Sequence, residues 1–126
     1  MARILVVEDS PIETHQFVNL LVKHGHQVLT ATSGDDGLAL AREEVPDAIL
    51  MDVVLPGMNG FQATRQITRG AETRHIPVIM ISSKKQPADR VWGERQGASA
   101  YMVKPVNHDA LIACLDSLLQ SRKAAP

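Results

Sequence analysis

Five short, continuous apolar runs constrain the fold of this chain more than any other feature of its sequence. Several of them lack polar residues at alternate positions, which is typical of strands that are buried on both faces of a parallel sheet. The runs cover residues 4–7, 28–29, 48–51, 78–81 and 101–103. We therefore expect a five-stranded parallel sheet that is covered by helices on both faces.

Segments with helical signals separate these runs. Ser10 is a predicted N-cap, Pro11 stands at the first helical position, Glu13 is at the third position of a capping box, and Gly25 can end this helix. Further helices are predicted over residues 33–44, 61–69 and 87–96, and an apolar stripe at helical spacing predicts a last helix after residue 107. Alternating strands and helices with right-handed crossovers predict a doubly wound (βα)5 three-layer α/β sandwich.

Length and composition indicate one ordinary domain. The chain has 126 residues and a formal net charge of −1, and its longest apolar run, residues 110–115, is far below the roughly 20 residues that cross a bilayer. Because Cys114 has no partner for an internal disulfide, we expect a reducing, cytoplasmic location. The 13 basic and 14 acidic residues give no overall basic field, so we expect no direct contact with nucleic acid. Residues 1–120 form the predicted domain, residues 121–126 a short flexible tail, and no output domain is expected.

Reactive side chains follow four of the predicted strands. Glu8 and Asp9 come after the first run, Asp52 after the third, Ser82 after the fourth and Lys104 after the fifth. Ligands of doubly wound sheets bind at the carboxyl ends of the strands, so these groups should meet there. Two carboxylates about 4 Å apart repel by roughly 4 kcal/mol at an effective dielectric near 20, so three of them require a cation. Oxygen ligands favour Mg²⁺, and Asp52 could then act as a nucleophile toward a phosphoryl group that Lys104 and Ser82 help to hold.

This pattern resembles the CheY-like response-regulator receiver domains along the whole chain. The family carries an acidic pair after the first strand, Asp after the third, Ser or Thr after the fourth and Lys-Pro after the fifth, and residues 51–60, MDVVLPGMNG, resemble its phosphoacceptor loop. The resemblance implies the sheet order 2-1-3-4-5. It also implies that Asp52 accepts a phosphoryl group from the phosphohistidine of a CheA-like sensor kinase in a two-component phosphorelay, without being an enzyme that turns over a separate substrate.

The resemblance assigns the metal ligands as well. Asp9, Asp52 and the backbone carbonyl of Val54 would bind Mg²⁺, and Glu8 would act through a metal-bound water. Receivers differ in two positions that tune the lifetime of the phosphoryl group, occupied here by Val54 and Lys84. An apolar Val54 cannot orient an attacking water, and Lys84 could hold the phosphoryl group, so we predict slow or moderate self-dephosphorylation.

The expected output is a change of surface. By resemblance, Ser82 moves toward the phosphoryl group and Tyr101 turns inward into the space that it leaves. This would reshape the face built by the fourth helix, fifth strand and fifth helix, which would bind a downstream protein. The resemblance further implies a monomer, with a phosphorylation-dependent dimer as the alternative.

A narrower resemblance concerns residues 25–29, 60–66 and 92–98, which are similar to single-domain regulators of the chemotaxis-like systems that control type IV pili and twitching motility. Other classes fit less well. A phosphatase of the haloacid dehalogenase type needs an acid where Val54 stands, and a flavodoxin-like FMN site needs Ser, Thr and Gly where Glu8 and Asp9 stand. A protein-interaction module that works without phosphorylation remains open.

Overall fold

The computed structural model describes residues 1–124, with side chains as far as Ser121. Helices and strands alternate along this part of the chain, as the sequence predicts. The strands are β1 (Arg3–Val7), β2 (Gln27–Ala31), β3 (Ala48–Asp52), β4 (Val78–Ser82) and β5 (Ala100–Val103). The helices are α1 (Pro11–Lys23), α2 (Gly34–Glu44), α3 (Gly60–Arg69), α4 (Pro87–Arg95) and α5 (His108–Ala124).

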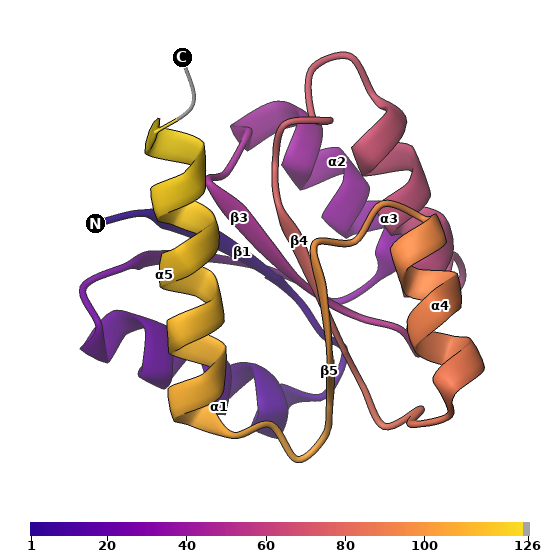
Figure 1. Ribbon diagram of the computed structural model, residues 1–126, viewed down its shortest axis with the longest axis horizontal. Helices are drawn as coiled ribbons and strands as arrows, with labels where there is room; N and C mark the ends of the chain where they lie inside the picture. The colour runs from indigo at the N-terminus through magenta and orange to yellow at the C-terminus, as the bar shows by residue number, and fades with distance from the viewer. Residues whose placement is uncertain (125–126) are drawn as a thin grey trace.

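The strands form one parallel sheet in the order β2-β1-β3-β4-β5, which confirms the predicted order. Helices α1 and α5 cover one face of the sheet, and α2, α3 and α4 cover the other (Figure 1). Every residue of β3 and β4 is buried, as expected for central strands with helices on both sides. The three-layer sandwich is therefore confirmed.

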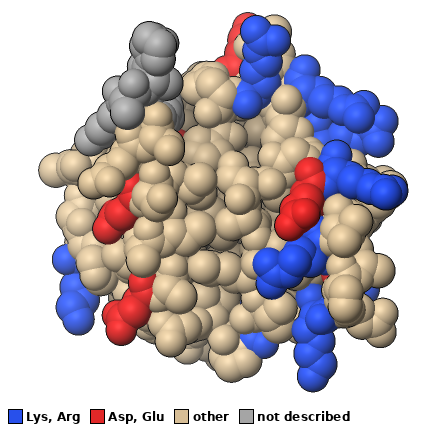
Figure 2. Space-filling view, in the orientation of Figure 1, with Lys and Arg blue, Asp and Glu red and all other residues tan. Residues whose placement is uncertain are grey.

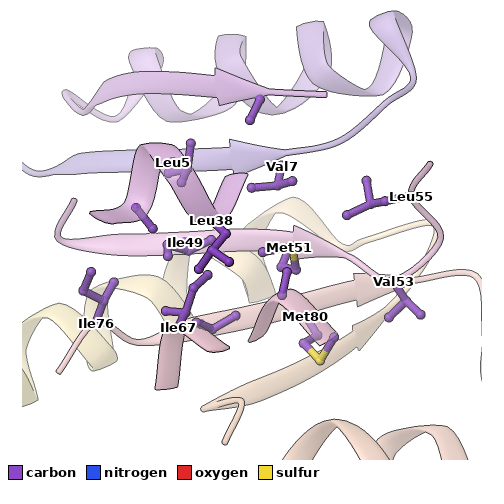
Figure 3. Close-up of a cluster of buried hydrophobic side chains, with 14 of the residues drawn as sticks. Leu5, Val7, Leu38, Ile49, Met51, Val53, Leu55, Ile67, Ile76 and Met80 are labelled. Carbon is purple, nitrogen blue, oxygen red and sulfur yellow. The ribbon is translucent and has the colours of Figure 1, made fainter. Parts of the chain in front are cut away.

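Two separate hydrophobic clusters lie on the two faces of the sheet. Alternate residues of each strand point to opposite faces, so β1 sends Leu5 toward α2 and α3 and Ile4 toward α1 and α5. Figure 3 shows the first cluster, in which Leu38 of α2 and Ile67 of α3 pack against strand residues such as Ile49. Both clusters fix the sheet rigidly, so the ends of the strands have defined positions.

The start of α1 differs from the prediction in one respect. Ser10 is the N-cap and its side chain accepts the Glu13 N–H, with Pro11 in the first turn, as predicted. The capping box is wrong, because the Ser10 N–H donates to the carboxylate of Glu8 at 3.1 Å while Glu13 forms an ion pair with Lys104. A half-buried ammonium is a stronger partner for a carboxylate than a backbone N–H, because both groups are charged.

The end of the chain also differs. Helix α5 continues to Ala124, so the backbone of residues 121–124 is helical where the sequence predicts a tail, and residues 125–126 lie outside the described residues. Between Leu119 and residue 124 there is neither Gly nor Pro, so nothing in the sequence stops the helix once its apolar stripe has ended. Among residues 1–124, no helix combines the length and the apolar character that a membrane crossing requires.

Candidate functional site

The three predicted acidic residues meet at the carboxyl edge of the sheet. Glu8 and Asp9 directly follow β1, and Asp52 ends the neighbouring strand β3. One carboxylate oxygen from each residue lies within 4.8 Å of the others. Glu8 and Asp52 are buried, at 2% and 6% exposure, whereas Asp9 is exposed and leaves the cluster open to solvent. This all-oxygen donor set suits Mg²⁺, which binds a few carboxylates and completes its shell with water.

Lys104 is the cationic partner of this cluster. Its Nζ lies 2.9 Å from Glu8 Oε1, 3.0 Å from Asp52 Oδ2 and 2.8 Å from Glu13 Oε1. The second Glu8 oxygen accepts the Ser10 N–H, so the carboxylate is fixed on both sides. Because Lys104 follows β5 while Glu8 follows β1, these contacts tie together both halves of the sheet edge.

In this pocket, burial and hydrogen bonding shift the pKa values of Glu8 and Lys104 in opposite directions. Burial raises the pKa of Glu8 to about 7, although the hydrogen bonds from Lys104 and Ser10 lower it. Burial alone disfavours the charge on Lys104, but its hydrogen bonds with Glu13, Glu8 and Asp52 outweigh this effect and raise its pKa. Lys104 therefore stays charged, while the charge of Glu8 changes near neutral pH.

Ser82 lies next to Lys104 on the side of the pocket formed by β4 and β5. Ser82 ends β4, is fully buried, and its Oγ accepts the Lys84 N–H at 3.0 Å. The Lys104 N–H donates to the Ser82 carbonyl, which holds the ends of β4 and β5 together. Ser82 thus lies beside Lys104 at the carboxyl edge of the sheet, where the sequence predicts it.

Tyr101 lies inward in this structure. It is 4% exposed, and its hydroxyl donates to the Lys84 carbonyl at 2.7 Å. Burial raises the pKa of Tyr101, and the guanidinium of Arg90 lies 5.7 Å from its ring centroid. Gly93 of α4 permits this packing, because a Cβ atom there would approach the ring to 3.0 Å. Tyr101 thus connects the loop after Ser82 to α4.

Two residues of the site are not evident from the sequence alone. Glu13 enters the pocket through its ion pair with Lys104. Gly60 opens α3 directly against β3, and a Cβ atom there would overlap the carbonyl group of Asp52. In the sequence, the only local sign of this contact between α3 and β3 is that Gly60 directly follows Asn59, the N-cap residue. Val54 lies in the loop between β3 and α3. Its N–H donates to Asp52 Oδ1 at 3.3 Å, and its side chain is exposed.

Known proteins share both the sequence and the fold. The family described as "Response regulator receiver domain" matches residues 4–116. Protein PilH of Pseudomonas aeruginosa is 56% identical over 119 residues, which cover 94% of this chain and 98% of PilH. Transcriptional regulatory protein AfsQ1 of Streptomyces coelicolor is 39% identical over 120 residues, which cover 95% of this chain but 52% of AfsQ1.

A solved structure extends the similarity to the site. The crystal structure of the receiver domain of a sensor histidine kinase from Pseudomonas aeruginosa PAO1 contains a magnesium ion coordinated in its active site cleft. It is 29% identical to this chain, has a TM-score of 0.88, and the match covers 94% of this chain and 98% of that chain. The acidic cluster of this chain fits the magnesium site of such domains. Because the family match extends from β1 into α5, the chain belongs to the response regulator receiver domains.

Proposed function

We propose that this chain is a response regulator that takes a phosphoryl group from a histidine kinase onto Asp52. One observation carries the proposal: the Asp52 carboxylate is buried, lies among Glu8 and Asp9, and has the ammonium of Lys104 at 3.0 Å. A buried carboxylate that is held this way is a fixed nucleophile beside concentrated positive charge. The proposal includes the cytoplasmic location expected from the sequence.

The transfer itself needs little from the protein beyond position and charge. An oxygen of Asp52 attacks the phosphorus, the phosphorus–nitrogen bond of the phosphohistidine breaks, and its electron pair stays on the imidazole nitrogen. Lys104 neutralises negative charge that develops on the phosphoryl oxygens. Asp9, Asp52 and the Val54 carbonyl would hold Mg²⁺, with Glu8 acting through a water. When bound, Mg²⁺ supplies further positive charge to those oxygens.

Ser82 and Tyr101 would carry the signal to the surface. Once Asp52 is phosphorylated, the Ser82 hydroxyl donates to a phosphoryl oxygen, and its hydrogen bond with the Lys84 N–H is exchanged for this one. The resemblance implies that Tyr101 turns inward when Ser82 moves, but Tyr101 is already inward here, with its hydroxyl bonded to the Lys84 carbonyl. Phosphorylation would therefore stabilise this inward position. The surface that responds is the α4-β5-α5 face, on which Val91 and Trp92 are about half exposed. A bias of a few kcal/mol between two pre-existing arrangements is enough for this switch.

The pathway follows from similarity. Identity of 56% to PilH, together with the segments 25–29, 60–66 and 92–98, supports a CheA-like kinase as donor and a downstream protein of a type IV pilus system as target. We propose control of twitching motility on this basis. A monomer that can dimerise on phosphorylation fits the same proposal.

The lifetime of the phosphoryl group is a further part of the proposal. The exposed side chain of Val54 is apolar and cannot orient a water by hydrogen bonding. Lys84, whose N–H already contacts Ser82, places a positive charge beside the same loop. We expect slow or moderate self-dephosphorylation of the purified phosphoprotein, followed by intact mass over time; loss within seconds would contradict it.

The proposed function is tested by intact mass spectrometry after incubation with acetyl phosphate, with and without Mg²⁺. We expect one phosphoryl adduct that requires Mg²⁺, is lost in Asp52→Asn and is kept in the matched control Asp116→Asn, whose carboxylate lies exposed on α5. An adduct that persists in Asp52→Asn would place the acceptor elsewhere. No adduct from acetyl phosphate or from a CheA-like kinase would favour an interaction module that works without phosphorylation.

A further inference from the structure

The near-zero net charge conceals two regions of opposite sign. Residues 1–52 contain nine acidic and three basic residues, whereas residues 53–107 contain eight basic and three acidic residues. In Figure 2 most of the visible Lys and Arg side chains gather on the right-hand side, where α3 and α4 lie in Figure 1. Lys104 is an exception among these basic residues, because it lies in the acidic pocket at the carboxyl edge of the sheet.

A groove of about 750 Å³ runs between α2 and α3 on this side. We call it the arginine groove, defined by Arg42 of α2 and by Gln62, Arg65, Gln66 and Arg69 of α3, which are all exposed. The residues from α3 are spaced by three and four positions, so they share one face of the helix. All the charged side chains that line the groove are arginines, so its charge is entirely positive.

These guanidinium groups lack acidic partners inside the molecule. Arg65 and Arg69 form no ion pair with any residue that the structure describes, and Arg42 bonds only weakly to Gln66, at 3.4 Å. Arg65 and Arg69 stand four residues apart on one helix, where two like charges destabilise it by a few tenths of a kcal/mol. An arrangement that costs stability and forms no internal pair is suited to an external anionic ligand.

The positive surface continues beyond the groove. Arg69 also lines a second hollow of about 630 Å³, which Arg74 and Arg95 line as well. Within residues 1–121, whose side chains are described, neither Arg74 nor Arg95 forms an ion pair. The ligand surface is thus a track of guanidinium groups rather than a single closed pocket, which fits an extended chain better than a small molecule.

We propose that the arginine groove binds an acidic segment of a partner protein. Arginine offers a planar pair of donors that matches a carboxylate, and the amides of Gln62 and Gln66 can donate to and accept from a peptide backbone. Single-stranded nucleic acid fits less well, because it is bound by stacking successive bases on aromatic rings, and neither hollow is lined by Phe, Tyr or Trp. None of the acidic-cluster residues lines the groove, although Gly57 and Met58 of the loop after Asp52 do. The groove therefore adds a second docking surface to the receiver.

Fluorescence anisotropy tests this with a labelled peptide of alternating Glu and Ser residues. Titration with the wild-type protein should give saturable binding that weakens as salt rises, since screening acts over about 10 Å at 0.1 M ionic strength. We expect Arg65→Gln/Arg69→Gln to weaken binding about tenfold or more, because two charge-assisted contacts are lost. The matched control Lys23→Gln/Lys85→Gln removes the same charge from outside the groove and should change affinity less than about twofold.

The remaining outcomes are equally decisive. Equal weakening by both double variants would mean that only net charge attracts the peptide, and it would overturn the proposal. Tighter binding of a labelled oligouridine RNA than of the acidic peptide would also overturn it, in favour of a nucleic-acid surface. Because all four substituted side chains are exposed, circular dichroism should show both double variants to be folded.

Discussion

The acidic pocket and the arginine groove are two charged regions of one small domain, and they are constructed in opposite ways. In the pocket, Glu8 and Asp52 are buried and share the ammonium of Lys104. In the groove, Arg65 and Arg69 are exposed and lack an acidic partner among the described residues. Buried charge requires an internal partner because desolvation is costly, whereas exposed charge can remain open for a ligand. The pocket is therefore sensitive to its own residues, and the groove is sensitive to what binds it.

Removing the cation from the pocket should produce the largest effect. Lys104→Gln leaves buried Glu8 and Asp52 without their ammonium partner, so we expect the free energy of unfolding at pH 8 without Mg²⁺ to fall by about 3 kcal/mol. Urea unfolding measures this change. The exposed control Lys85→Gln should stay within about 0.5 kcal/mol of wild type. Equal stability of the two variants would show that the pocket does not depend on its internal pairing.

The pH dependence of the pocket is the next largest effect. Because the pKa of Glu8 is about 7 in the folded protein, a proton competes with Mg²⁺ below that pH. With this pKa, about nine-tenths of Glu8 is ionised at pH 8 and about one-tenth at pH 6. We therefore expect the affinity for Mg²⁺ to fall roughly tenfold between these two pH values. Isothermal titration calorimetry at both pH values measures it, and Glu8→Gln should abolish most of the change.

The same pKa predicts how the metal-free protein responds to pH. Glu8 has a pKa of 4.5 as a reference and about 7 when folded, so the folded state binds its proton more tightly than the unfolded state. This contribution to stability is fully present below pH 4.5 and is lost as the pH rises to about 7. A thermal melt in EDTA should therefore show a falling Glu8-dependent contribution over that range. A rising contribution would contradict the pKa direction.

Substitutions in the groove should have the smallest effect on stability. Arg65→Gln/Arg69→Gln removes an unfavourable pair of like charges from α3, so the free energy of unfolding should stay within about 0.5 kcal/mol of wild type and rise slightly at low salt. Urea unfolding at two salt concentrations checks this. A clear loss of stability would mean that these arginines serve the fold and not a partner.

The fold could be predicted from the sequence because each local signal agrees with the global arrangement. Strands β3 and β4 have continuous apolar runs and prove buried at every residue. The acidic cluster could also be predicted from the sequence, because parallel strands bring the residues after β1 and β3 to one edge of the sheet regardless of their separation along the chain.

What the sequence could not predict depends on neighbours that are distant along the chain. Glu13 fits a capping box by local pattern, and only the position of Lys104 shows that it turns into the pocket. The overlap that a side chain at Gly60 would cause depends on where β3 ends. The arginine groove could not be predicted for another reason. The net charge of −1 is a total, and it does not indicate where acidic and basic side chains lie on the folded surface.

The proposed function rests on Asp52 as the phosphoryl acceptor, and chemical trapping identifies the acceptor residue. Protein treated with acetyl phosphate and Mg²⁺ is reduced with borohydride, which converts an aspartyl phosphate into homoserine, and is then digested and sequenced by tandem mass spectrometry. We predict homoserine at position 52 alone, and none when Mg²⁺ is replaced by EDTA. Homoserine at Asp9 or at another carboxylate, with residue 52 unchanged, would contradict the assignment of Asp52 as the phosphoryl acceptor.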